Sequence, residues 1–209
     1  MLGVMAARSY TASRRRGRPA SVELVLDASE RLIREDGFHA ATMDELAAAA
    51  GVSRATVFNR FGSKLGVLEA LFNRCLESPE MEAVLGAFEV DDPVAGLDAV
   101  VETSCAMWEG HGFIVEQLEA IASLEGGARA LLEGQWEQQR AALAGLARRL
   151  ARAGRLRPGL GEARATATLH MLTSLESFLS LRREYGLSLR QTRDTIGELA
   201  RTTCQAPGG

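Results

Sequence analysis

The sequence is poor in cysteine, aromatic residues and long hydrophobic runs, and each shortage excludes a class of protein. Of its 209 residues only Cys75, Cys105 and Cys204 are cysteines, and they form no CxxC pair or metal-ligand spacing. A disulfide scaffold is therefore excluded, and a reducing compartment is expected. No apolar run approaches the roughly 18 residues of a membrane helix. The arginine run at residues 14–16 is not followed by the apolar stretch of an export signal, so we expect a cytoplasmic protein.

What the sequence does contain favours an all-α fold. Apolar residues make up 46% and charged residues 24% of the chain, with abundant Ala, Leu and Arg and few β-branched runs. Residues 1–64 hold ten Arg or Lys against seven Asp or Glu, whereas residues 65–209 hold fourteen against twenty. This asymmetry predicts a nucleic-acid contact near the N-terminal end only.

Local helix signals divide the first third of the chain. Residues 1–18 carry five arginines and no acid, which predicts a flexible basic arm. A helix is expected from Ser21, as its N-cap, to Gly37, as its C-cap. Two short helices follow, one opened by a Thr42–Glu45 capping box and the other ending near residue 61.

These two short helices are joined by a tight turn that contains Gly51 and Ser53, which is the outline of a helix-turn-helix motif at about residues 42–61. A plain helical hairpin in a bundle core is the alternative. The outward residues of the second helix favour DNA, because they can read base edges or bind phosphate oxygens and include no acid. They are Arg54, Ala55, Thr56, Asn59 and Arg60.

This region resembles the DNA-binding domain of TetR-family transcriptional regulators over about residues 20–75. The residues that carry the likeness are Gly37-Phe38, Thr42-Met43-Asp44-Glu45-Leu46-Ala47 and Ala50-Gly51-Val52-Ser53-Arg54-Ala55-Thr56-Val57-Phe58-Asn59-Arg60-Phe61-Gly62-Ser63-Lys64.

The resemblance implies a role for each matching position. Arg54, Ala55 and Thr56 would approach base edges, and the phosphate contacts would come from Thr42, Ser53, Asn59, Arg60 and Lys64. Family members usually carry a tyrosine at the position of Phe58, where the hydroxyl reaches a phosphate. In this chain Asn59 or Arg60 would have to replace that contact.

The predicted domains are the arm (1–18), the helix-turn-helix domain (19–77) and a ligand-binding and dimerisation domain (78–209). In the last domain we expect helices at about 94–108, 113–124, 128–153, 161–185 and 188–203, separated by glycine- or proline-containing breaks.

The last two predicted helices carry apolar stripes, and dimerisation through them follows from the resemblance more than from the stripes. The resemblance implies a homodimer built from this helix pair, and two helix-turn-helix units on a two-fold axis would read a palindrome in double-stranded DNA. The alternative is that the stripes serve the monomer's own core. The interface candidates are Leu169, Leu172, Leu179, Leu189, Ile196 and Leu199.

The resemblance also implies a pocket for a small-molecule effector among the middle helices. Met and aromatic side chains suit an adaptable pocket for a largely apolar ligand, although they fill ordinary cores equally well. The candidate lining residues are Met107, Trp108, His111, Phe113, Leu118, Trp136, Met171 and Phe178. No cofactor or metal site is expected.

The resulting hypothesis is a repressor that is released from its operator by a ligand. Other readings are an activator of the same fold, a redox-switched regulator that uses Cys105 or Cys75, or a helical enzyme. The enzyme reading is weak, because the chain lacks a phosphate-binding glycine loop and the HExxH and GxSxG motifs, and the Glu116–Glu119 pair has no Glu-x-x-His partner.

Overall fold

The computed structural model describes residues 19–37, 41–122, 124 and 126–206. The basic arm predicted at residues 1–18 lies outside this part of the chain. The described residues form helices and no strand, apart from an isolated bridge between Leu156 and Gln205. The prediction of an all-α fold is confirmed. None of the described helices is both long and apolar enough to span a membrane.

The chain divides into two compact units, and each unit is made of two separate stretches of the sequence. Unit 1 consists of residues 1–78 and 113–132, and unit 2 consists of residues 79–112 and 133–209. Unit 1 thus combines the predicted helix-turn-helix domain with a segment that the sequence had suggested would belong to the ligand-binding domain. The helices α7 (Pro93–Ala122) and α8 (Gly126–Arg152) each contribute residues to both units.

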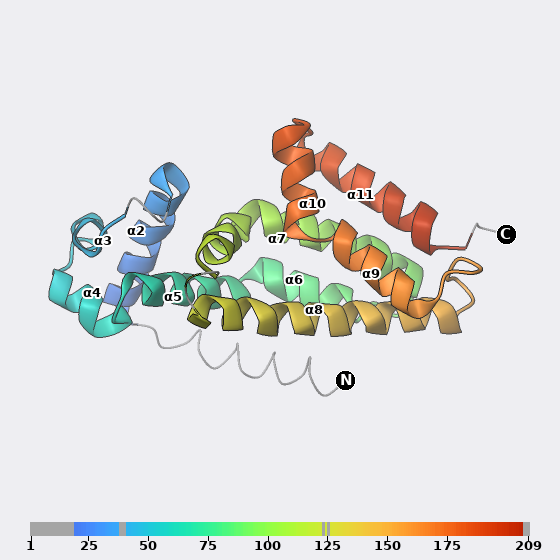
Figure 1. The fold of residues 1–209 in the computed structure, drawn as a ribbon, viewed down its shortest axis with the longest axis horizontal. Helices are drawn as coiled ribbons and strands as arrows, with labels where there is room; N and C mark the ends of the chain where they lie inside the picture. The colour runs from blue at the N-terminus through green and yellow to red at the C-terminus, as the bar shows by residue number, and fades with distance from the viewer. Residues whose placement is uncertain (1–18, 38–40, 123, 125, 207–209) are drawn as a thin grey trace. The chain divides into compact units, whose positions relative to one another are not determined.

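Unit 1 begins with four consecutive helices that pack around one apolar core (Figure 1). They are α2 (Ala20–Asp36), α3 (Met43–Ala50), α4 (Arg54–Phe61) and α5 (Lys64–Leu76). The buried residues of this core come from all four helices and from the segment before α3, and they are Val25, Ala28, Ala41, Leu46, Ala47, Ala50, Val57 and Val67.

The start of α2 differs from the prediction by two residues. Ser21 lies inside the helix, and Pro19 occupies the N-cap position without a side-chain hydrogen bond. The Pro19 carbonyl accepts hydrogen bonds from the backbone N–H groups of Val22 and Glu23 at 2.9 and 3.4 Å. Proline is already held at a φ that suits the entry to a helix, here −58°. The end of α2 at Gly37 agrees with the prediction.

Unit 2 contains the other helices and the first parts of α7 and the last parts of α8. These helices are α6 (Pro79–Ala87), α9 (Glu162–Leu172), α10 (Leu175–Leu179), the π-helix η1 (Ser180–Glu184) and α11 (Leu189–Cys204). Figure 1 shows α9 and α11 as neighbours, and both contribute fully buried leucine or isoleucine side chains.

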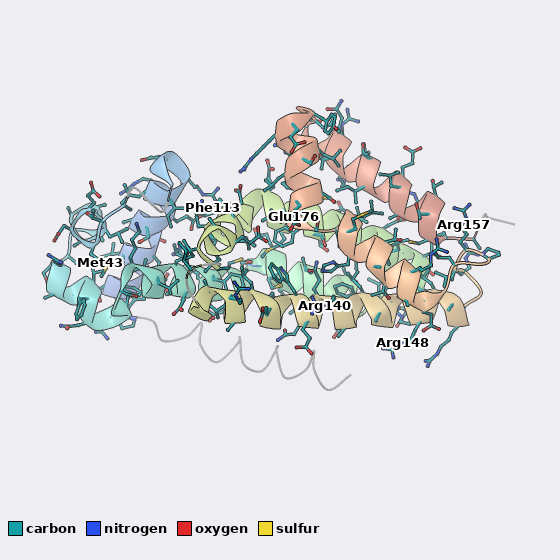
Figure 2. All side chains as sticks on the ribbon, in the orientation of Figure 1. Met43, Phe113, Arg140, Arg148, Arg157 and Glu176 are labelled. Carbon is teal, nitrogen blue, oxygen red and sulfur yellow. The ribbon has the colours of Figure 1, made fainter. Side chains whose placement is uncertain are left out.

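Two predicted boundaries in this part of the chain are wrong. The glycines at 110 and 112 do not end a helix, because α7 continues through them to Ala122. Conversely, the single helix expected at 161–185 is interrupted at Thr173 and Ser174. Ser174 has an extended backbone and accepts a hydrogen bond from the Ser177 N–H, so that it caps a new helix, α10. Glu176 then lies exposed in the first turn of α10 (Figure 2).

Candidate DNA-binding site

The N-terminus of α3 is fixed by the predicted capping box. The Glu45 N–H donates to the Thr42 hydroxyl oxygen at 3.2 Å, and the Thr42 N–H donates back to the Glu45 carboxylate at 2.8 Å. The Thr42 hydroxyl also donates to this carboxylate at 2.9 Å. These hydrogen bonds, the backbone one above all, hold the pKa of Glu45 below its usual value. Thr42 is therefore oriented by the cap and is still exposed to solvent.

The turn between α3 and α4 depends on a left-handed glycine. Gly51 has φ 67° and ψ 28°, a backbone conformation that a residue with a Cβ rarely adopts, and its N–H donates to carbonyls of the last turn of α3. Ser53 then opens α4 by accepting a hydrogen bond from the Thr56 N–H at 3.1 Å. This turn joins α3 and α4 as the sequence predicted, and the two helices form a helix-turn-helix motif.

Helix α4 has an inner and an outer face. Val57 is fully buried in the unit 1 core, and Phe61 packs against the same core. The outer face carries no acidic residue, and its exposed members are Arg54, Ala55, Phe58, Asn59 and Arg60. Thr56 is half-buried, with its hydroxyl 2.9 Å from that of Ser53. A surface of this composition suits a polyanion.

Arg54 is held by a contact that a ligand could displace. Its guanidinium lies 3.3 Å from the carboxylate of Asp44 on α3, and the two side chains are 68% and 67% exposed. Ion pairs with this exposure contribute little to stability, because solvent screens them. Arg54 can therefore exchange Asp44 for another acceptor at small cost.

Lys64, the first residue of α5, lies at a helix N-terminus that Ser63 caps by accepting the Gly66 N–H at 3.0 Å. Burial lowers the pKa of its ammonium group, and the charge of Glu45 opposes this effect. A positive charge at the N-terminus of a helix is a suitable environment for a phosphate.

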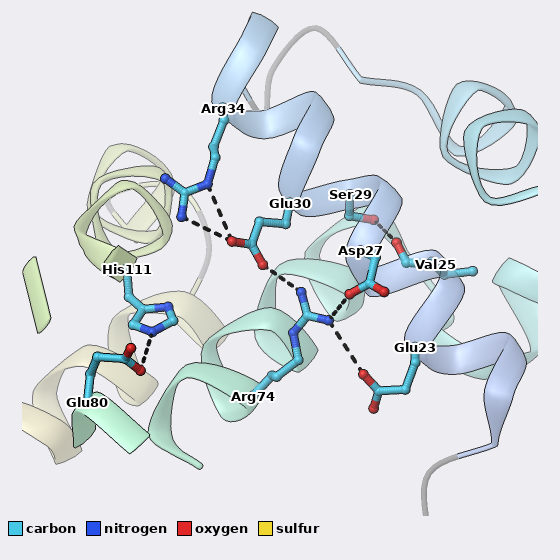
Figure 3. Close-up of polar contacts among 9 residues, drawn as sticks. All are labelled: Glu23, Val25, Asp27, Ser29, Glu30, Arg34, Arg74, Glu80 and His111. Carbon is cyan, nitrogen blue, oxygen red and sulfur yellow. Dashed lines mark hydrogen bonds and ion pairs between the residues drawn. The ribbon is translucent and has the colours of Figure 1, made fainter. Parts of the chain in front are cut away.

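A cluster of charges that the sequence analysis missed ties α5 to α2. The Arg74 guanidinium donates to Asp27 at 2.5 Å and Glu30 at 2.7 Å, and it lies 3.5 Å from Glu23 (Figure 3). Arg34 contacts the other oxygen of Glu30 at 3.0 Å. The acids recur along one face of α2 at a spacing of four and then three residues. This spacing was the signal in the sequence that could have indicated a charge cluster. The basic partner comes from a later helix, so no local pattern pointed to it.

The predicted ligand contacts do not form one set. In unit 2, Met107 and Phe178 are buried, Trp136 is half-buried, the Trp108 indole donates to the Thr173 carbonyl at 2.9 Å, and His111 lies 3.3 Å from Glu80 (Figure 3).

The other candidates lie elsewhere. Phe113 and Leu118 belong to unit 1, where the Phe113 ring (Figure 2) has the Arg34 guanidinium 3.8 Å from its centroid. Met171 is 59% exposed, so it does not line an enclosed interior of this chain.

The interface prediction needs a correction for half of its residues. Leu169, Leu172 and Ile196 are buried within the protomer, where α9 packs against α11, and cannot supply apolar area to a second copy. These three serve the monomer core, as the alternative reading had it. Leu179 and Leu189 are half-buried, and Leu199 is 46% exposed on α11.

The cysteines do not have the surroundings of redox sensors. All three are buried, with Cys105 only 2% exposed. Burial raises the pKa of the Cys105 thiol to about 11, and the charge of Arg193 opposes this shift only in part. A sensor thiol needs exposure and a lowered pKa, so the redox-switch alternative loses its support. Among the described residues no group of His, Cys, Asp and Glu could hold a metal ion.

Comparison with known proteins agrees with this geometry. Residues 25–71 match the family described as bacterial regulatory proteins, tetR family. The HTH-type transcriptional regulator YvkB of Bacillus subtilis (strain 168) is 42% identical over 50 residues, which are 24% of this chain. The matched segment spans 26% of YvkB, about a quarter of its length.

Solved structures resemble almost the whole chain. SmeT, the repressor of the Stenotrophomonas maltophilia multidrug efflux pump SmeDEF, has 23% identity and a TM-score of 0.71 over 90% of this chain and 91% of SmeT. A transcriptional regulator from Saccharomonospora viridis in complex with choline has 18% identity and a TM-score of 0.74 over 89% and 98%. At these identities the likeness shows the fold.

The fold and the motif together define an all-α protein with an N-terminal helix-turn-helix motif. More closely, the N-terminal segment that contains this motif is similar to the tetR family of bacterial regulatory proteins. The two solved structures named above are themselves described as a repressor and a transcriptional regulator.

Proposed function

We propose that this chain is a homodimeric repressor that binds a palindromic operator and leaves it when a small, largely apolar ligand binds. The observation that carries the proposal is the outer face of α4, which is exposed, rich in arginine and free of acids. Arg54, Ala55 and Thr56 are assigned to base edges. The phosphate contacts are assigned to Thr42, Ser53, Asn59, Arg60 and Lys64.

Dimerisation follows from the number of bases that one motif can reach. A single α4 contacts too few bases for specificity, whereas two copies on a two-fold axis read half-sites about one helical turn, or a multiple of it, apart. Two exposed apolar side chains on the last helices support such a contact: Met171 on α9 is 59% exposed and Leu199 on α11 is 46% exposed.

The ligand would act on α7. This helix is continuous, with residues up to Gly112 in unit 2 and residues from Phe113 in unit 1. A ligand that favours one position of α7 would therefore bias the unit that carries α4, and operator affinity would fall by the difference in ligand affinity between the two states. SmeT, which has the same fold, has been solved with triclosan, a largely apolar molecule.

The experiment that tests the proposal is selection from random duplex DNA at physiological salt. We expect a palindromic motif, and Arg54→Ala should weaken binding by about 1–3 kcal/mol and relax the preference at one base position in each half-site. Arg190→Ala is the matched control, because Arg190 is similarly exposed (77%) and pairs with a carboxylate, that of Asp194.

Two results would contradict the proposal. One is retention of every sequence alike by the wild-type protein after refolding to remove any bound ligand. The other is unchanged base preference in Arg54→Ala.

The selected operator then serves to screen for compounds that release the protein, beginning with triclosan. If a compound lowers operator affinity by some factor, the operator must lower the affinity of the protein for that compound by the same factor. Equal compound affinities with and without operator would contradict the ligand mechanism.

A further inference from the structure

The outer face of α4 carries one residue to which the proposed roles assign no DNA contact. Phe58 is 60% exposed, although the other phenylalanine of this helix, Phe61, packs against the core. Phe58 is the large apolar side chain exposed on α4, a helix that is described in full. The other exposed residues of this face are Arg54, Ala55, Asn59 and Arg60. An exposed phenyl ring at the centre of a polar, basic surface adds nothing to the core of unit 1.

The position of Phe58 on the helix relates it to the base-reading residues. Arg54 and Phe58 are four residues apart, so their side chains lie on the same side of α4. Val57, the residue directly before Phe58, is fully buried, and its burial fixes which face of α4 points toward the core. Phe58 thus stands beside Arg54, one helical turn further along.

The chemistry of the side chain limits what it can contact. A phenyl ring has no hydrogen-bond donor for a phosphate oxygen and no donor or acceptor for a polar base edge. In the major groove the apolar feature of the base edges is the C5-methyl group of thymine, and phenylalanine is among the side chains that contact it.

We infer that Phe58 is a specificity-determining residue that reads a thymine by packing its ring against the 5-methyl group. This inference rests on the proposed function, because it requires α4 to enter the major groove of an operator. It adds a preference for thymine at one position of each half-site, close to the base that Arg54 reads.

The test changes the DNA before the protein. In the selected operator each thymine is replaced by uracil, one position at a time in one half-site, and affinities are measured by fluorescence anisotropy. At one position we expect wild-type affinity to fall about fourfold, the effect of losing one buried methylene-sized group. Replacement at the other thymines in the half-site should have less effect, apart from any that Ala55 or Thr56 contacts.

The protein variant then assigns the effect to Phe58. Phe58→Ala should bind more weakly, and its affinity should no longer respond to uracil at the sensitive position. Phe58→Tyr keeps the ring and should keep the response. Tyr185→Ala is the control for loss of an exposed aromatic ring, because Tyr185 is 71% exposed in unit 2, outside the helix-turn-helix motif.

Each outcome decides the question, and the uracil scan on wild-type protein does so even if a variant fails to fold. Absence of any uracil-sensitive thymine overturns the inference while leaving the proposed function intact. An undiminished uracil response in Phe58→Ala also overturns it and assigns the methyl contact to another residue. If the wild-type protein selects no operator at all, the proposed function fails and the inference fails with it.

Discussion

Thr192 is a polar residue in an apolar place. It is completely buried on α11, and its hydroxyl has no hydrogen-bond partner among the described residues. Two other buried hydroxyls have partners: Ser29 donates to the Val25 carbonyl at 2.7 Å, and Thr173 donates to the Leu169 carbonyl at 2.8 Å. Because a buried hydroxyl without a partner has lost its water and gained nothing, Thr192 costs stability.

Replacing Thr192 with valine should therefore stabilise the fold by about 1 kcal/mol, since valine has almost the same shape and no hydroxyl to desolvate. Urea unfolding followed by circular dichroism measures this change. Thr173→Val is the matched control, because it removes a satisfied hydroxyl and should destabilise by about 0.5–1.5 kcal/mol. A loss of stability in Thr192→Val equal to that in the control would mean that the hydroxyl is hydrogen-bonded in solution.

At the scale of helices, the sequence predicts what local residues decide. The ends of α3 and α4 depend on Thr42, Gly51 and Ser53, whose hydrogen bonds reach only three or four residues along the chain. Such signals are readable without a structure, and the boundaries agree.

The C-terminal boundaries depend on contacts between distant residues. Gly112 stays inside α7, and a Cβ there would lie 2.8 Å from Cδ1 of Leu175, so the glycine makes room for a neighbouring helix. The break after α9 is likewise supported from α7, through the Trp108 indole and the Thr173 carbonyl. Neither partner can be identified from a local pattern, and a glycine read locally indicates a helix end.

The two glycines of α7 offer a paired test of this reading. Gly110→Ala meets no atom within 4 Å and should stabilise the helix by about 0.5–1 kcal/mol through reduced backbone entropy. Gly112→Ala has the same propensity gain, but its Cβ presses on the buried Leu175 side chain, and overpacking costs about 1–3 kcal/mol. We expect the midpoint of thermal unfolding to rise in the first variant and fall in the second. Equal shifts would show that α10 moves aside freely.

At the scale of the whole molecule, the sequence reveals apolar stripes but not what covers them. Leu169 and Ile196 have the same periodicity as Leu199, yet the first two are covered by the protomer itself and the third is exposed. Periodicity is a property of one helix, whereas coverage depends on the neighbours. The exposed face of α4 was easier to predict, because its exposure and charge follow from the short motif alone.

Leu199→Glu should weaken dimerisation, because a charge would replace apolar area at the proposed contact between copies. Sedimentation equilibrium should show a larger monomer fraction, and operator affinity should fall because the two half-sites are no longer bound together. Leu24→Glu is the control, since Leu24 on α2 is similarly exposed (52%). An unchanged association constant in Leu199→Glu would place the contact between copies elsewhere.

The division of the chain also sets the order in which it can be completed during synthesis. Residues 79–112 belong to unit 2 but are made before residues 113–132, which complete unit 1. Unit 1 is therefore complete only after residues 113–132 of α7 and α8 have been made, and their buried side chains include Leu118 and Leu132. A fragment that ends at Ser78 would lack residues 113–132 of unit 1. Transplanting unit 1 as a whole onto another protein would thus require exchanging two separate stretches of the gene.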